Sequence, residues 1–137
     1  MARIMCIDYG LKRCGIAATD PLQIIATGLT VVHPKELIPF LKKYAQTEEV
    51  ETILIGLPKN LDGSDTHATV PSQKAFEDLK KAFPKILVKQ IDEQFSSRRA
   101  SQAMVEMGMK KKNRRKKENI DLITATMLLQ EYMENNK

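Results

Sequence analysis

Three acidic residues lie where a carboxylate could do chemistry rather than only keep the chain soluble. Asp8 ends the apolar run IMCID, Glu93 follows the run ILVKQI, and Asp121 lies in the helical pattern NIDLITATMLL. A carboxylate at the end of an apolar strand is costly to bury unless something binds it. If the three acids converge, their oxygens form a site for Mg²⁺ or Mn²⁺, hard cations that bind carboxylates and phosphate together.

Each acid also has a simpler interpretation. Asp8 could begin a hairpin turn by accepting hydrogen bonds from nearby backbone N–H groups. Glu93 and Asp121 could each stabilise the positive end of a helix. Glu93 also faces a distance problem: if one strand lies between its own strand and that of Asp8, the two backbones are about 9 to 10 Å apart. The prediction of a metal site therefore depends on all three acids together.

The residues that favour zinc or a disulfide are scarce. The chain has two histidines, His33 and His67, far apart in sequence, and two cysteines, Cys6 and Cys14, in apolar surroundings. This pattern lacks the paired spacing of a zinc site and the ladder of a disulfide-rich domain. We expect buried, reduced thiols, and we expect any metal ion to be held by oxygen atoms.

A dense basic run precedes Asp121. Positions 110–117 read KKKNRRKK, and a run of this kind beside a metal site would attract phosphates with salt-dependent affinity. It could equally be a solvated arm. Aromatic residues make up 5% of the chain and none interrupts the run, so a stacking platform for single strands is not indicated. The candidate phosphate ligands in it are Lys110, Lys111, Lys112, Arg114, Arg115, Lys116 and Lys117.

Two other segments could contact nucleic acid. Lys12 and Arg13 follow the first apolar run, and Lys59 and Asn60 begin the turn-rich stretch KNLDGSDTHATVPSQ. That stretch is either an ordinary long connection or a lid over substrate phosphates.

The elements that must position these residues alternate along the chain. Three β-like runs come first, and helices and strands then alternate, which indicates parallel pairing. We therefore predict an α/β fold with a mixed sheet, antiparallel strands joined to parallel ones, and helices on its faces. In the last helix, the spacing of Ile120, Ile123, Met127 and Leu128 predicts one buried face. The expected strands are 3–8, 14–18, 28–32, 52–57 and 86–91, and the expected helices are 34–46, about 70–82, one ending at Gly108, and 119–134.

Length and composition limit the class of protein. With 137 residues, 42% hydrophobic and 28% charged, residues 1–137 are expected to form a single domain with a sizeable core, which excludes a disordered chain. The net charge of +5 favours a polyanionic partner. No apolar stretch long enough for a signal peptide or a membrane span precedes Asp8, so we expect a cytoplasmic protein. The sequence does not determine the oligomeric state.

Four motifs together resemble one family. The motifs are DYGLKRCGIAATD, ILIGLPKNLDGS, IDEQFSSRRA and KKKNRRKKENIDLITATMLLQEY, and they cover nearly the whole chain in order. They resemble the YqgF-type (RuvX) family of pre-16S ribosomal RNA nucleases, also described as Holliday-junction-resolvase-like. The resemblance implies a ribonuclease-H-like fold in which three antiparallel strands join parallel ones.

The resemblance also implies roles for particular residues. The family's acidic positions fall on Asp8, Glu93 and Asp121, where they would hold the divalent metal that activates water for phosphodiester hydrolysis. One position departs from the family pattern, since Gln94 stands where the family usually has arginine. Because Gln94 cannot supply a charge for a phosphate, another cation such as Arg98 or Arg99 would have to do so.

These observations lead to one main hypothesis with alternatives. The main hypothesis is a metal-dependent endonuclease acting on structured nucleic acid, foremost precursor 16S rRNA in ribosome biogenesis, with a DNA junction as the other substrate. A non-catalytic nucleic-acid or ribosome-associated binding protein is the alternative from another class. The Asp8-x-Gly10 pattern also loosely resembles the phosphate loop of actin-like ATPases. Those enzymes close two domains around ATP, for which 137 residues leave too little room.

Overall fold

The computed structural model describes residues 2–58, 69–93 and 117–135 of the chain. In that part the chain alternates between strands and helices as the sequence predicts. The elements, in chain order, are β1 (Arg3–Asp8), β2 (Cys14–Thr19), β3 (Ala26–Val32), a 3-10 turn η1 (Pro34–Glu36), α1 (Leu37–Thr47), β4 (Val50–Pro58), α2 (Thr69–Ala82), β5 (Leu87–Glu93) and α5 (Lys117–Asn135). The expected helix that ends at Gly108 lies outside the described residues.

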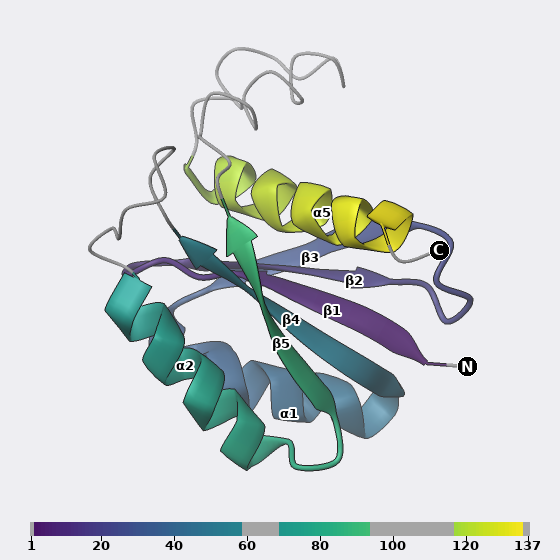
Figure 1. Cartoon of the computed structure of the whole chain (residues 1–137), viewed down its shortest axis with the longest axis horizontal. Coiled ribbons are helices and arrows are strands. Elements are labelled where there is room, and N and C mark those ends of the chain that lie inside the picture. The colour runs from purple at the N-terminus through teal and green to yellow at the C-terminus, as the bar shows by residue number, and fades with distance from the viewer. Residues whose placement is uncertain (1, 59–68, 94–116, 136–137) are drawn as a thin grey trace.

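The five strands form one mixed sheet in the order β3-β2-β1-β4-β5. The pairs β1–β2 and β2–β3 are antiparallel, whereas β1–β4 and β4–β5 are parallel. The predicted mixed sheet, with three antiparallel strands joined to parallel ones, is therefore confirmed. Because β1, β4 and β5 run in the same direction, their carboxyl ends lie along one edge of the sheet (Figure 1).

Helices cover both faces of the sheet. In Figure 1, α1 and α2 pack against one face and α5 crosses the other. Alternate residues of β1 divide between the two layers, as strand geometry requires: Met5 and Ile7 join the core under α1 and α2, while Ile4 and Cys6 join the core under α5. Cys6 and Cys14 are both buried, as expected from their apolar surroundings, and the structure pairs neither of these two thiols in a disulfide. Within the described ranges, no helix has the length and apolar character needed to cross a membrane.

Two details differ from the sequence prediction. Glu93 is the last residue of β5 rather than a residue beyond it, so its backbone is held in the sheet. In α5 the buried face is built on Ala125, Leu128 and Leu129, whereas Ile120, Ile123 and Met127 of the predicted face are only half-buried. The predicted face is right at Leu128 and misplaced at the other three positions, because small residues in the sheet allow α5 to pack closely there.

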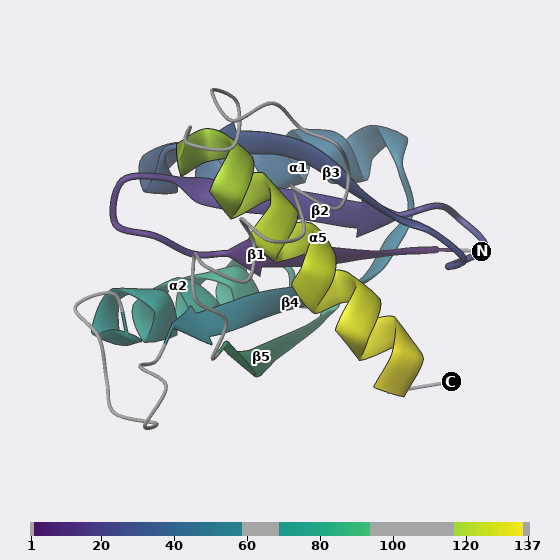
Figure 2. The same ribbon diagram turned by 90° about the horizontal axis from the view of Figure 1, so that it is seen from above.

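Two glycines allow α5 to lie directly on the sheet. Figure 2 shows α5 crossing the sheet diagonally, with its first turns over β2 and β3. A Cβ atom at Gly15 would lie 2.2 Å from the backbone oxygen of Asp121, and one at Gly28 would lie 2.7 Å from Cγ of Leu122. At Gly15 the neighbour is helix backbone, which cannot move without moving the helix.

This contact predicts that Gly15→Ala destabilises the protein by about 1–3 kcal/mol, the usual cost of inserting a methyl group into a packed site. The free energy of unfolding, measured by urea denaturation, checks it. Gly28→Ala is the matched control, because its new methyl group meets a flexible leucine side chain and should cost less. An equal cost at the two positions would contradict the special role of the backbone contact at Gly15.

Candidate active site

One row of residues crosses the carboxyl edge of the sheet at the level of Asp8. Asp8 pairs with Gly15 of β2 on one side and with Gly56 of β4 on the other, and Gly56 in turn pairs with Ile91 of β5. Paired residues in neighbouring strands share a face, so the two positions flanking Asp8 carry no side chains. On the α5 side of this row, the backbone of α5 lies against Gly15, and Asp8 carries the only side chain among Asp8, Gly15 and Gly56.

Asp8 is buried, with 9% of its surface exposed. It follows Ile4 and Cys6 at two-residue spacing, and both of these lie under α5, so Asp8 occupies the α5 face at the end of β1. A carboxylate that is charged in this position loses most of its hydration and needs compensation from positive charge or hydrogen bonds. The burial of Asp8 therefore makes the neighbours of its carboxylate decisive for its charge.

Asp121 reaches the same edge from α5. Its backbone lies against Gly15, the direct neighbour of Asp8 across β1 and β2. Its carboxylate accepts a hydrogen bond from Nε of Arg13, with 3.3 Å between Nε and Oδ2, and both side chains are about 30% exposed or less. Arg13 belongs to the hairpin that joins β1 to β2. Asp121 is thus held in place by residues 108 positions away in the sequence.

The thiol of Cys14 responds to both carboxylates. Its pKa is raised to about 11, mainly by burial, with a smaller increase from the charges of Asp8 and Asp121, while a hydrogen bond to the Gly10 carbonyl acts in the opposite direction. This agrees with the register, which places Asp8 and the backbone of Asp121 beside Gly15, the next residue of β2. The structure brings these two predicted acids together at one end of the sheet.

Glu93 is placed by its backbone. It pairs with Pro58 and lies two residues beyond Ile91, so it extends past the row of Asp8 on β5. Ile91 packs in the core under α5, and strand alternation puts position 93 on that same face and position 92 on the other. β4 does lie between β1 and β5, which is the arrangement for which the sequence analysis expects a backbone spacing of about 9 to 10 Å. The Glu93 side chain lies outside what the structure describes.

The described side chains do not complete a metal site by themselves. Among them, no group of three or more His, Cys, Asp and Glu side chains is spaced to hold a metal ion. Asp8 and Asp121 supply two carboxylates, and the third predicted ligand, Glu93, is one whose side chain is not described. The donors that are present are carboxylate oxygens, the ligand type that fits Mg²⁺ or Mn²⁺.

The predicted nucleic-acid ligands divide into three groups. Lys12 is exposed in the β1–β2 hairpin, while the neighbouring Arg13 is engaged by Asp121. Lys117 is the first residue of α5, so the basic run leads into the helix that carries Asp121. The remaining candidates lie outside the described residues: Lys59, Asn60, Arg98, Arg99, Lys110, Lys111, Lys112, Arg114, Arg115 and Lys116.

Sequence reasoning missed the pairing of Arg13 with Asp121 and the two glycines beside Asp8. Arg13 had been grouped with the phosphate ligands because it follows Lys12 in a basic pair. No local pattern connects it to a residue in the last helix. Gly15 and Gly56 do stand in two of the quoted motifs, and their position next to apolar strand residues was the available signal.

The strand order, the antiparallel-to-parallel change and the acid at the end of the central strand define a ribonuclease-H-like α/β protein with an acidic edge. The solved structure of T. thermophilus RuvC in complex with Holliday junction substrate is similar, with a TM-score of 0.58 and 13% sequence identity. The similarity covers 98% of this chain and 95% of that chain. The chain belongs to the RuvX family: the family model described as "RuvX: Holliday junction resolvase" matches residues 2–135.

Relatives at much higher identity match along the whole chain. A protein of Christiangramia forsetii is 44% identical over 133 residues, covering 97% of this chain and 98% of the relative. A protein of Bacteroides thetaiotaomicron is 44% identical over 137 residues, covering 100% of this chain and 99% of the relative. Both carry the name "Putative pre-16S rRNA nuclease". The family predicted from the four motifs is confirmed.

The raised pKa of Cys14 predicts a loss of stability at alkaline pH. The thiol of the unfolded chain releases its proton near pH 8.5, but the folded one does so only near pH 11. The stabilisation is therefore complete below about pH 8.5 and is lost as the pH rises through 11. In chelator, the wild type should lose up to about 3 kcal/mol more free energy of unfolding than Cys14→Ala between pH 8 and 11.

Cys6→Ala is the control for this titration, because it makes the same truncation on the other face of the sheet and keeps the Cys14 thiol. It should retain the alkaline loss of the wild type. Parallel stability curves for wild type and Cys14→Ala over this pH range would refute the assignment.

Proposed function

We propose that this chain is a metal-dependent endonuclease that hydrolyses phosphodiesters in structured nucleic acid, with precursor 16S rRNA as the foremost substrate. The observation that carries the proposal is the convergence of Asp8 and Asp121 at the carboxyl edge of the sheet, with position 93 on the same face. The names of relatives that are 44% identical over the full chain support precursor 16S rRNA as the substrate.

The residues fit a divalent metal ion. Asp8, Glu93 and Asp121 would hold Mg²⁺ or Mn²⁺ through carboxylate oxygens, the ligand type that these hard cations prefer. When bound, the ion supplies activation of water and neutralisation of the negative charge that develops on the phosphate.

The chain's own residues prepare this chemistry. Arg13 fixes the orientation of the Asp121 carboxylate by donating a hydrogen bond to one of its oxygens. The packing of α5 on Gly15 keeps Asp121 beside Asp8. Water exclusion at the buried Asp8 strengthens every charge interaction in the site. We thus assign Arg13 to positioning rather than to phosphate binding.

The cations near this edge would hold the substrate backbone. Lys12 is exposed beside the acids in the hairpin, and Lys117 begins the helix into which the basic run leads. Such contacts read phosphates and not bases, so they serve RNA and DNA alike. The rest of the basic set, including Arg98 and Arg99, would compensate for the neutral Gln94.

A DNA junction is the second candidate substrate. The description of the matching family model names Holliday junction resolvase, and the fold is similar to that of a junction-bound RuvC. The proposal takes residues 1–137 as one ribonuclease-H-like domain that acts in the cytoplasm, where precursor rRNA is processed.

The decisive test is cleavage of a precursor 16S rRNA fragment with Mg²⁺ or Mn²⁺, beside a four-way DNA junction of similar charge. Asp8→Asn should lower the cleavage rate at least about 100-fold, because it removes charge from the centre of the site. It should also weaken Mn²⁺ binding, which paramagnetic resonance measures without any substrate. Asp121→Asn and Glu93→Gln should act in the same direction.

Asp20→Asn is the matched control, since it makes the same change beyond the opposite end of β2 and should leave cleavage unchanged. Equal cleavage by wild type and Asp8→Asn would defeat the assignment of the acids. Salt-sensitive RNA binding without any metal-dependent product from the wild type would instead favour the non-catalytic binding protein.

A further inference from the structure

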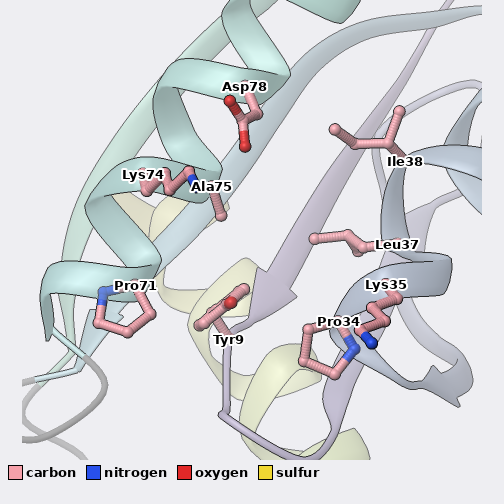
Figure 3. Close-up of a pocket in the computed structure, with 9 residues that line it drawn as sticks. All are labelled: Tyr9, Pro34, Lys35, Leu37, Ile38, Pro71, Lys74, Ala75 and Asp78. Atoms are coloured by element: carbon pink, nitrogen blue, oxygen red, sulfur yellow. The ribbon is translucent and has the colours of Figure 1, made fainter.

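A cavity opens at the same edge of the sheet, on the face opposite the acids. It lies between the start of α2 and the segment formed by η1 and the start of α1 (Figure 3). Its volume is about 250 Å³. Tyr9, the residue directly after Asp8, lies at the end of β1 between these two walls. The end of β1 therefore contributes to both faces of the sheet: the carboxylate of Asp8 lies on the α5 side, and the phenol ring of Tyr9 lies on the side of α1 and α2.

The walls of the cavity are apolar and partly flat. The ring of Tyr9 lies between Pro34 on one side and Pro71 on the other, and the aliphatic side chains of Leu37, Ile38 and Ala75 complete the lining. A volume below the range of about 300–1,000 Å³ usual for drug-sized ligands suits one small planar group. Aromatic and proline rings offer such a group the flat contacts that nucleobases make with proteins.

Three charged side chains line the cavity and could bind polar groups of a ligand. Lys35 and Lys74 stand on opposite walls, both are exposed, and neither forms an ion pair among the described residues. Asp78 lies on the α2 wall, deeper along the helix than Pro71. Burial is the main cause of the raised pKa of the Tyr9 hydroxyl, and the charges of Cys14 and Asp78 raise it further. The cavity thus combines two cations near its walls with one acceptor.

We propose that this cavity binds one unpaired nucleobase of the substrate strand, with the adjacent phosphates on Lys35 and Lys74. The base would lie against the Tyr9 ring, and Asp78 would accept a hydrogen bond from an amino group of the base. Because the carboxylate of Asp78 repels phosphate, the nucleotide would bind with its base inside the cavity and its phosphates at the mouth. The proposal rests on the proposed function in one respect, because it names the part of the substrate beside the cleaved bond.

The position of the cavity relative to the acids supports this occupant over an unrelated ligand. Asp8 and Tyr9 are consecutive residues at the end of β1, and their side chains point to opposite faces of the sheet. In the proposal, a strand whose phosphate lies at Asp8 passes the end of β1 and places an unpaired base against Tyr9. This arrangement would restrict the enzyme to places where a base is unpaired, such as a single-stranded end or loop.

The test uses the full chain in chelator, so that binding is measured without cleavage. The probes are a six-nucleotide single-stranded RNA of mixed sequence and a six-unit abasic strand of equal charge. Wild type should bind the intact strand about 10-fold more tightly than the abasic one, as stacking of a single base provides. Ala75→Met fills the cavity from α2, away from the acids, and should reduce that ratio to near one. The same ratio in wild type and Ala75→Met would overturn the proposal.

Two lysine variants test the phosphate contacts. Lys74→Gln should weaken binding of both strands and lower the dependence on salt by about one phosphate contact. Lys81→Gln, the same change in the last turn of α2, should leave both unchanged. Equal effects of the two variants would refute a local role for Lys74. A normal cleavage assay beside a failed binding test would reject the cavity alone, whereas base-dependent binding without cleavage would reject only the nuclease.

Discussion

The arrangement of the acidic edge depends on the contact between the backbone of α5 and Gly15 of β2. If residue 15 of β2 had a larger side chain, α5 would lie further from the sheet. Because position 15 has no Cβ, Asp121 comes down beside Asp8, and Arg13 from the adjacent hairpin meets its carboxylate. The negative charges of both Asp8 and Asp121 also raise the pKa of the Cys14 thiol. The convergence of these acids is thus a consequence of backbone packing, which overcomes the repulsion between their like charges.

The acidic side chains at this edge require nearby positive charge to offset their mutual repulsion. Asp8 is buried and Asp121 is partly buried, and like charges held together in a low dielectric repel one another. Arg13 compensates one carboxylate from the side, and a divalent cation would compensate the whole group. A basic residue that a sequence pattern assigns to phosphate binding can therefore serve the acids instead.

The alternation of a β-strand gives the edge two different surfaces. Asp8 and Tyr9 are consecutive, yet one belongs to the acidic face under α5 and the other to the cavity between η1 and α2. If the cavity binds a base as proposed, the reverse face gives this chain a second means of contacting a strand. Chemistry and substrate selection can then act on adjacent nucleotides.

The sequence by itself determined the strands and helices of the described residues, the mixed sheet and the family, because strand alternation, helix spacing and turn residues are local. Only the tertiary structure decided which residues meet. The register that puts Gly15 and Gly56 beside Asp8, the pairing of Arg13 with Asp121 across 108 positions, and the buried face of α5 all arise from contacts between distant segments. The spacing of apolar residues within α5 misplaces part of its buried face, because glycines in β2 and β3 determine how the helix packs on the sheet. These glycines lie outside the helix, so its own sequence pattern holds no information about them.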